Sequence, residues 1–254
     1  MKFKFVCLNL WRGGELMDGI LDFLAKENAD IVVLQEVYDG HDQTLPRQYR
    51  SIQVLQDKFH YPYIDFAPTV IDVLPVGKVT SGNAVLSRFQ IKGHDVTFFN
   101  EPFGERDAND PKTFPITPRN LQHVVLDIPG GEINVFNLQG VWDLDGDNVS
   151  EKRRNMSNVI IKAITGKQNV IVAGDTNAKH TNPVMRAIEG HLNSVFGDEL
   201  TTSFNMHRKD NPGYATAVVD MIYVSKNIVT LEHDCPDVDI SDHLPLTAWF
   251  EISA

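Results

Sequence analysis

Runs of apolar residues along the chain predict buried β-strands separated by a few helices. The segments at 3–11 (FKFVCLNLW) and 31–37 (IVVLQEV) predict two strands. Between them, Leu16, Ile20 and Leu24 recur at helical spacing. The chain therefore opens with a strand, helix, strand unit.

The middle of the chain changes from helical to strand-like periodicity. Apolar residues at roughly helical intervals predict a helix over 43–60, with Pro46 in its first turn. Shorter apolar runs predict strands at 69–74, 83–87, 94–99, 121–128 and 132–138. The last two strands flank Pro129, Gly130 and Gly131, which indicates a hairpin.

The remaining pattern indicates an α/β protein with more strands than helices. It predicts a helix at about 150–165, a buried strand over 170–173, a short helix near 183–190 and final strands at 218–224 and 246–252. This pattern does not fit a simple alternating barrel, and it favours two packed sheets with helices outside. No repeat or linker interrupts the sequence, so we expect one domain over residues 1–254.

A proline-rich segment over residues 100–118 separates two groups of predicted strands. It holds Pro102, Pro111, Pro115 and Pro118 and few apolar residues. Long loops in compact domains are usually functional or disordered. We expect this segment to form a rim of the substrate cleft.

Composition narrows the class of protein. Hydrophobic residues make up 42% and charged residues 22%, as in ordinary soluble domains. No apolar run approaches the roughly 18 residues of a membrane span, and the first residues become polar too soon for a signal peptide. Cys7 and Cys235 form no metal-ligand cluster or disulfide framework, which fits a reducing compartment. We therefore expect a cytoplasmic protein, with Cys7 packed in the core.

The formal net charge of -11 argues against a protein that coats nucleic acid through bulk electrostatics. It leaves room for a local basic patch, so nucleic acid stays among the candidate partners. We expect a monomer.

Charged and amide side chains recur where the predicted strands end. They are Asn9, Glu36, Asn137, Gln139, Asp175, Asn177, Asp220, Asp242 and His243. On extended backbone, Asp175 and Asn177 share a face, because side chains two residues apart point the same way. The alternative is a tight turn in which both bond to backbone. The repetition of the feature at six strand ends favours a common pocket.

These residue types match metal-assisted attack of water on a phosphate ester. Glu36 and Asp242 offer hard oxygen ligands that suit Mg²⁺, with Mn²⁺ as an alternative ion. Asp175 is a candidate base for the water, and Asn177 and His243 are candidate donors to phosphoryl oxygens. In this interpretation Asp220 orients His243. No serine–histidine pair or cysteine presents itself as a nucleophile.

Six motifs carry a resemblance to a known family. They are NLW at 9–11, LQEV at 34–37, SGNAVLSR at 81–88, GDTN at 174–177, VDMIYV at 219–224 and SDHLPL at 241–246. In this order they resemble the endonuclease/exonuclease/phosphatase superfamily. The resemblance implies a four-layer αββα sandwich similar to deoxyribonuclease I. It also implies cleavage of phosphodiesters or phosphomonoesters, which in this family include DNA, RNA, sphingomyelin and inositol phosphates.

Carried onto this chain, the resemblance implies that Asn9 and Glu36 hold the metal region. It implies that Asp175 and Asn177 handle the water and the phosphate. It further implies an Asp220 and His243 pair, with Asp242 beside them.

One position departs from the family. Many members carry Asn-x-His where this chain has Asn137 and Gln139, and abasic-site endonucleases have a tyrosine at the second position. Glutamine can donate a hydrogen bond but cannot be cationic. We expect Asn137 and Gln139 to enter the cleft together, with Gln139 donating to a phosphoryl oxygen.

Four further residues are candidate substrate contacts: Arg88, Arg119, Trp11 and Arg12. The alternative is that the arginines are solvated and that Trp11 packs. The basic stretch 207–209 is expected to be a solvated turn. A tryptophan-rich segment of DNA-cutting relatives has no counterpart there, which counts against a dedicated abasic-site enzyme.

The sequence thus favours a Mg²⁺-dependent phosphodiesterase or nuclease. One alternative is a phosphomonoesterase of the same family. The other is a binding module that keeps the fold and has lost catalysis, with Gln139 as the first lost residue.

Overall fold

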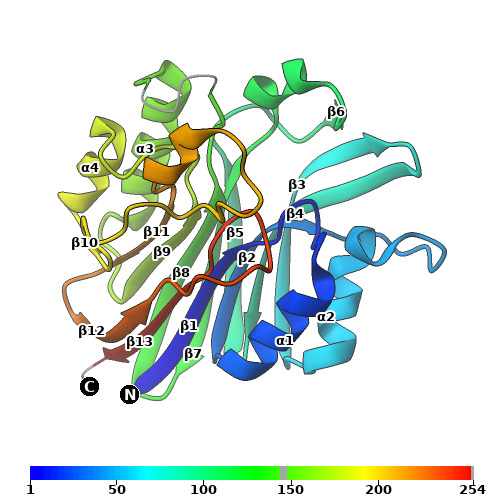
Figure 1. Cartoon of the computed structure of the whole chain (residues 1–254). Coiled ribbons are helices and arrows are strands. Elements are labelled where there is room, and N and C mark those ends of the chain that lie inside the picture. Colours follow the sequence, from blue (N-terminus) through cyan, green and yellow to red (C-terminus); the bar gives the residue numbers. More distant parts are fainter. Residues whose placement is uncertain (144–147, 253–254) are drawn as a thin grey trace.

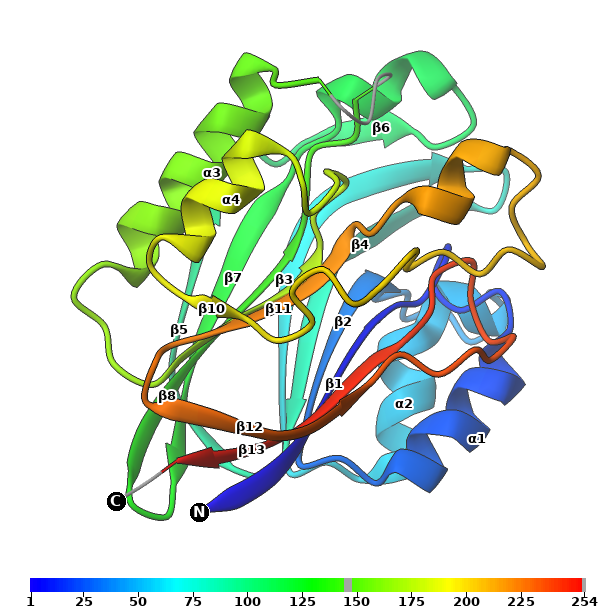
Figure 2. The ribbon, with the colours of Figure 1, turned by 60° about the vertical axis from the view of Figure 1, so that its left-hand side comes forward.

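The computed structural model describes residues 1–143 and 148–252, and it shows two β-sheets packed face to face between helices (Figures 1 and 2). The first sheet has the order β12-β13-β1-β2-β4-β3-β6. Its strands are β1 Lys2–Asn9, β2 Ile31–Tyr38, β3 Tyr63–Leu74, β4 Gly77–Ser87, β6 Glu105–Asp107, β12 Ile228–Asp234 and β13 Leu246–Ile252.

The second sheet has the order β10-β11-β9-β8-β7-β5. Its strands are β5 Gln90–Phe98, β7 Asn120–Ile128, β8 Gly131–Gln139, β9 Val170–Asp175, β10 Asn193–Ser194 and β11 Asp220–Val224. Parallel and antiparallel pairs occur in both sheets. The predicted fold, a four-layer sandwich of two mixed sheets flanked by helices, is confirmed.

Helices cover the outer face of each sheet. The helices are α1 Met17–Glu27, α2 Ser51–Phe59, α3 Glu151–Ile164 and α4 Pro183–Glu189, with short 3-10 helices η1 Arg47–Arg50, η2 Pro111–Ile116 and η3 Pro212–Thr216. In Figure 2, α1 and α2 lie against one sheet and α3 and α4 against the other. Among the described residues, no helix combines the length and apolarity needed to cross a membrane.

Three apolar clusters hold the four layers together. The central cluster joins the sheets and contains Phe5, Val33 and Val135. A second cluster lies between the first sheet and α1 and α2, and a third lies between the second sheet and α3 and α4. Because central strands such as β2 and β9 are covered on both sides, their sequences are nearly continuous apolar runs.

Strand direction brings the polar strand ends to one edge of the sandwich. In the first sheet, β1 and β2 run parallel and Asn9 pairs with Gln35. In the second sheet, β8 and β9 run parallel and Gln139 pairs with Asp175. Antiparallel β11 begins at the same edge, where Asp220 also pairs with Asp175. The carboxyl ends of parallel strands are where sites commonly form in such sheets.

Most predicted elements are present, with differences at exposed segments. The expected helix over 43–60 begins later, because Pro46 precedes η1 and α2 starts at Ser51. The proline-rich segment 100–118 contains β6 and η2. The sequence did not predict β10 or β12, since β10 has two residues and β12 is mostly exposed.

Candidate active site

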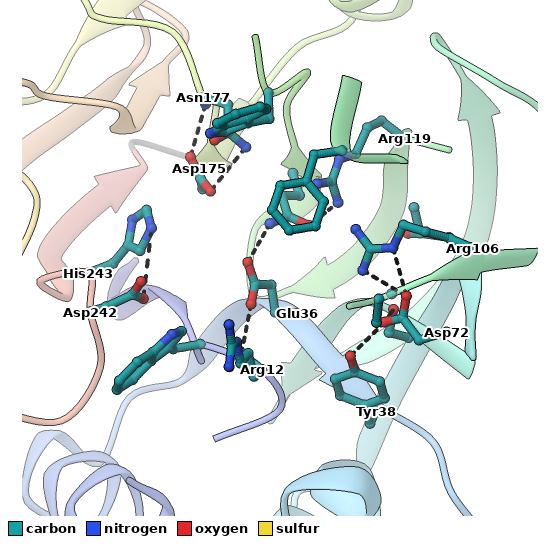
Figure 3. A pocket seen from close by; sticks show the side chains of 18 of the residues that line it. Arg12, Glu36, Tyr38, Asp72, Arg106, Arg119, Asp175, Asn177, Asp242 and His243 are labelled. Carbon is teal, nitrogen blue, oxygen red and sulfur yellow. Dashed lines mark hydrogen bonds and ion pairs between the residues drawn. The ribbon is translucent and has the colours of Figure 1, made fainter. Parts of the chain in front are cut away.

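A cavity of about 580 Å³ lies at the edge where the polar strand ends meet. Figure 3 shows its carboxylates, arginines and histidine facing one another from both sheets. The predicted site residues that line it are Trp11, Arg12, Glu36, Arg119, Gln139, Asp175, Asn177, Asp242 and His243. The expected rim is also there, because Arg106, Ala108, Asn109, Pro111 and Phe114 line the same cavity.

Glu36 reaches the cavity because β2 is irregular at this point. The pairing of β2 with β4 shifts register between Leu34 and Val37, and Glu36 has a φ of 56°. Bulges commonly re-aim a side chain beside a site, and a residue other than glycine with positive φ is uncommon. Gln35 meanwhile stays fully buried.

Backbone and side-chain donors keep Glu36 ionised. Its Oε2 accepts a hydrogen bond of 2.7 Å from the backbone N–H of Arg12, and its Oε1 accepts one of 2.7 Å from Gln139. Burial is the largest single influence and opposes ionisation of Glu36, but the bond from Arg12 and the other favourable contributions together outweigh it and lower the pKa. The charges of His243 and Arg119 act in the same direction.

Asp175 is presented by a strand end that requires glycine. Gly174 has a φ of +148°, and a Cβ there would lie 2.0 Å from the carbonyl oxygen of Leu138. Asp175 Oδ1 accepts a bond of 2.9 Å from the backbone N–H of Asn177, whose φ is 51°. The turn predicted as the alternative for this stretch is therefore present, and the same turn directs both side chains into the cavity.

Burial makes Asp175 a weaker acid than usual. It is 1% exposed, and this burial raises its pKa to about 6. The charge of His243 opposes the rise, while the charge of Asp220 adds to it. A carboxylate with a pKa near neutrality is well matched to accepting a proton.

His243 and Asp220 form a buried ion pair. His243 Nδ1 lies 2.8 Å from Asp220 Oδ2, and Asp220 sits behind the histidine rather than in the cavity wall. Burial alone would lower the pKa of His243, but three surrounding carboxylates raise it to about 10. They are, in decreasing order of effect, Asp220, Asp175 and Asp242. His243 is therefore an imidazolium at neutral pH.

Gln139 connects the two sides of the site. It donates to Glu36 Oε1, and its own Oε1 accepts a hydrogen bond from Arg119. Arg119 is 8% exposed, forms no ion pair with the described residues, and its Nε has no hydrogen-bond partner among them. A buried guanidinium without a carboxylate partner is costly unless an anion completes it.

A second network supports the rim segment, residues 105–116. The fully buried Asp72 accepts bonds from Arg106 Nε at 2.8 Å, from the Tyr38 hydroxyl and from Ser81. Arg106 also lies over the ring of Phe114, 5.7 Å from its centroid. Because its oxygens are all occupied, Asp72 positions the rim rather than offering a free ligand.

Lys209 is a cavity residue that the sequence did not predict. We expected stretch 207–209 to be a solvated turn, and this is wrong for Lys209, whose ammonium donates to Asp242 Oδ2. His207 and Arg208 are exposed as expected. A polar stretch carries no periodic signal that would show which of its side chains turns inward.

Two predicted site residues lie elsewhere. Asn137 does not enter the cleft with Gln139, since it is fully buried between the sheets and bonds to the carbonyl oxygens of Leu34 and Ala84 at 3.0 Å. Asn137 lies two residues before Gln139 on β8, farther from the edge of the sheet. Its side chain therefore links the two sheets by hydrogen bonds instead of lining the cavity.

Arg88 lies at the opposite end of the sandwich. It follows Ser87, which pairs with Ile31 at the start of β2, whereas the site lies at the end of β2, roughly 17 Å along the strand. There Arg88 contacts Asn28 and Asp30. The strand direction that separates it from the site is not visible in the sequence.

The donor set at Glu36 and Asp175 fits a hard divalent cation. Asn9 is fully buried, and its Nδ2 lies 3.2 Å from Glu36 Oε1 and 3.0 Å from Asp175 Oδ2, so both carboxylates converge on one atom. Neither carboxylate has an ion-pair partner of lysine or arginine among the described residues. Oxygen ligands in this arrangement suit Mg²⁺.

Other carboxylates of the site are already engaged. Asp175, Asp220 and His243 lie close enough to share an ion, but the hydrogen bond between Asp220 and His243 makes a charge network the better description. Asp242, expected as a metal ligand, accepts a hydrogen bond from Lys209 through its Oδ2.

Comparisons with known proteins agree with this geometry. The family model described as "Endonuclease/Exonuclease/phosphatase family" matches residues 7–243. A search of curated proteins finds no significant match. The similar solved structures include an endonuclease/exonuclease/phosphatase from Beutenbergia cavernae, with a TM-score of 0.77 and 18% identity over 99% of this chain and 72% of that one.

Two further structures show the range of the fold. A mannosyl-6-phosphatase from Bacteroides thetaiotaomicron has a TM-score of 0.71 and 16% identity, covering 98% of this chain and 99% of that one. The human Nocturnin catalytic domain with bound sulfate has a TM-score of 0.70 and 17% identity, covering 99% of this chain and 95% of that one. These likenesses establish the fold, and the family model extends over nearly the whole sequence. The chain belongs to the endonuclease/exonuclease/phosphatase family, whose members are phosphoesterase hydrolases.

Proposed function

We propose that this chain hydrolyses a phosphate ester by attack of water in the cavity, with Mg²⁺ or Mn²⁺ as its cofactor. The observation that carries the proposal is the convergence of two carboxylates without an ion-pair partner of lysine or arginine, Glu36 and Asp175, in a cavity that His243 and Arg119 also line. A site that combines free carboxylates with neighbouring cations suits a ligand that is both metal-bound and anionic.

Glu36 would hold the metal, with Asn9 and Asp175 beside it. A bound divalent cation would stabilise the negative charge that develops on a phosphoryl oxygen. Gln139 donates to Glu36 and would fix the orientation of that carboxylate. In this proposal Gln139 positions Glu36 and Arg119, and the direct bond to phosphate expected from the sequence belongs to other donors.

Asp175 would accept the proton of the attacking water. Its pKa of about 6 leaves it ionised at neutral pH while keeping it basic enough for the transfer. The backbone N–H of Asn177 holds one carboxylate oxygen in place.

His243 and Arg119 would donate to phosphoryl oxygens, and the Asn177 amide would do so by exchanging one of its present bonds, to Gly140 O or Asp175 Oδ2. His243 stays protonated because Asp220 accepts from its Nδ1, which leaves Nε2, 4.0 Å from Asp242 Oδ1, to donate to a bound ligand. Arg119 lines the cavity and has no carboxylate partner among the described residues, so its guanidinium would bind an anionic group there. Donors fixed in advance around developing charge are among the strongest contributions to catalysis.

The test is release of product from one generic phosphodiester and one generic phosphomonoester, each assayed with Mg²⁺, with Mn²⁺ and with excess chelator. The proposal predicts turnover of at least one ester that depends on the cation. The alternative, a module that binds phosphate ligands without cleaving them, would show binding and no turnover with either ion.

A further inference from the structure

Lys209 occupies a defined place on the cavity wall. Its ammonium lies 5.1 Å from the ring centroids of both Phe204 and Tyr214, and it donates to Asp242 Oδ2. The side chain is only 20% exposed. A lysine in a solvated turn would have neither the aromatic neighbours nor the carboxylate.

Backbone pairing fixes this lysine relative to His243. Phe204 and His243 form an isolated antiparallel bridge, and their rings lie 4.7 Å apart. The backbone N–H of Asn205 donates to Asp242 O at 3.0 Å. The segment that carries Lys209 is therefore tied to the strand end that carries Asp242 and His243.

The ammonium keeps donors for a ligand. It has three N–H groups, Asp242 accepts from one of them, and no other acceptor among the described residues contacts it. The rings of Phe204 and Tyr214 replace water on part of its surface, and electrostatic attraction strengthens where water is excluded. Since Lys209 lines the cavity, an oxyanion bound there can accept the remaining hydrogen bonds.

Lys209 adds a cation to a cavity that Arg12, Arg106, Arg119 and His243 also line. A phosphomonoester carries close to two negative charges near neutral pH, whereas a phosphodiester carries one. Because Coulomb attraction scales with the charge of the ligand, each added cation favours the monoester more than the diester.

We propose that Lys209 binds the phosphate group of the substrate and makes the site selective for phosphomonoesters over phosphodiesters. This inference rests on the proposed phosphoesterase function for the location of the scissile phosphate. It differs from the preference for phosphodiesters that the sequence alone supports, because the sequence does not place Lys209 in the site. The rival explanation is that the ion pair with Asp242 only anchors the segment around Lys209.

The experiment compares wild type with Lys209→Met, Lys209→Arg and Arg208→Met. Arg208 is the matched control, since it is adjacent, carries the same charge and pairs with exposed Asp239 outside the cavity. Binding of inorganic phosphate is measured by calorimetry, and melting temperatures are recorded for each variant. Where the wild type is active, kcat/KM is measured for p-nitrophenyl phosphate and bis(p-nitrophenyl) phosphate.

Lys209→Met should weaken phosphate binding by about tenfold or more, the scale of a hydrogen bond to a charged group. It should also lower kcat/KM for the monoester by a larger factor than for the diester. Lys209→Arg should retain most of the affinity, and Arg208→Met should match wild type. Lys209→Gln serves as the substitute if Lys209→Met does not fold.

Equal phosphate affinity in wild type and Lys209→Met would overturn the inference, as would an equal loss in Arg208→Met. A lowered melting temperature with unchanged phosphate affinity would support the anchoring role and overturn the inference too. Absence of turnover in wild type would contradict the proposed function alone, because the phosphate-binding comparison still decides the role of Lys209.

Discussion

At the scale of single residues, Asp175 combines a cost to folding with a proposed catalytic role. Its pKa is raised, to about 6, so the ionised form at neutral pH is less favourable in the folded chain than in the unfolded one. Asp175→Asn removes that charge and keeps the shape. We therefore predict that the melting temperature of the Asp175→Asn variant in chelator equals or exceeds that of wild type. We also predict that its kcat falls by roughly a hundredfold or more.

The same variant separates catalysis from structure. A lower melting temperature with normal specific activity in the folded fraction would assign Asp175 a structural role. Asp127 offers a matched control, because its exposed carboxylate pairs with Lys92 far from the cavity, at the opposite end of β7. Asp127→Asn should change neither quantity appreciably.

Asn137 and Gln139, two residues apart on β8, should respond in opposite ways to truncation. Gln139→Ala should lower kcat by about ten- to a hundredfold with little loss of stability, because it removes support from Glu36 and Arg119. Gln139→His should retain more activity, since a ring nitrogen can still donate to Glu36.

Asn137→Ala should instead destabilise the fold by about 3 kcal/mol or more, because it removes buried hydrogen bonds to carbonyl groups of β2 and β4 in the facing sheet. Urea unfolding and specific activity per folded molecule distinguish the two outcomes. If Asn137→Ala lost activity and kept its stability, its assignment to the interior would be contradicted.

At the scale of elements, the rim segment 105–116 depends on a buried ion pair. Asp72→Asn leaves the guanidinium of Arg106 without its carboxylate, so we predict a loss of about 3–5 kcal/mol in the free energy of unfolding. Glu105→Gln is the control, since the Glu105–Lys78 pair ties the same strand, β6, at an exposed position. The free energy of unfolding of Glu105→Gln should fall by less than about 1 kcal/mol. Similar losses in the two variants would refute this account of the rim.

How far the sequence predicts elements depends on burial. Strands covered on both faces, such as β2 and β9, appear as apolar runs, and their polar ends lead directly to Glu36 and Asp175. Edge strand β12 faces solvent over most of its length and gives no comparable signal. Asp72 was also missed, because a buried carboxylate inside a strand is recognised only by the partners that the fold supplies.

At the scale of the whole molecule, the two sheets divide the site between them. The first sheet supplies Glu36 and the rim, while the second supplies Asp175, Gln139 and Arg119. The sequence allowed both halves to be listed, since polar residues end several apolar runs. The sequence could not show the direction of β4, so Arg88 was wrongly expected in the site. It also could not show the loop conformation that brings Lys209 to Asp242.

The central claim, metal-dependent hydrolysis at the junction of the two sheets, is tested most directly by titrating Mg²⁺ against turnover in wild type and Glu36→Gln. The neutral amide keeps the shape of Glu36 but loses the charge that would hold the cation. The account predicts that wild-type turnover disappears in excess chelator and returns with Mg²⁺. It also predicts that Glu36→Gln remains roughly a hundredfold or more below wild type at saturating ester. Unchanged wild-type turnover in chelator, or equal turnover of the two proteins across the titration, would contradict it.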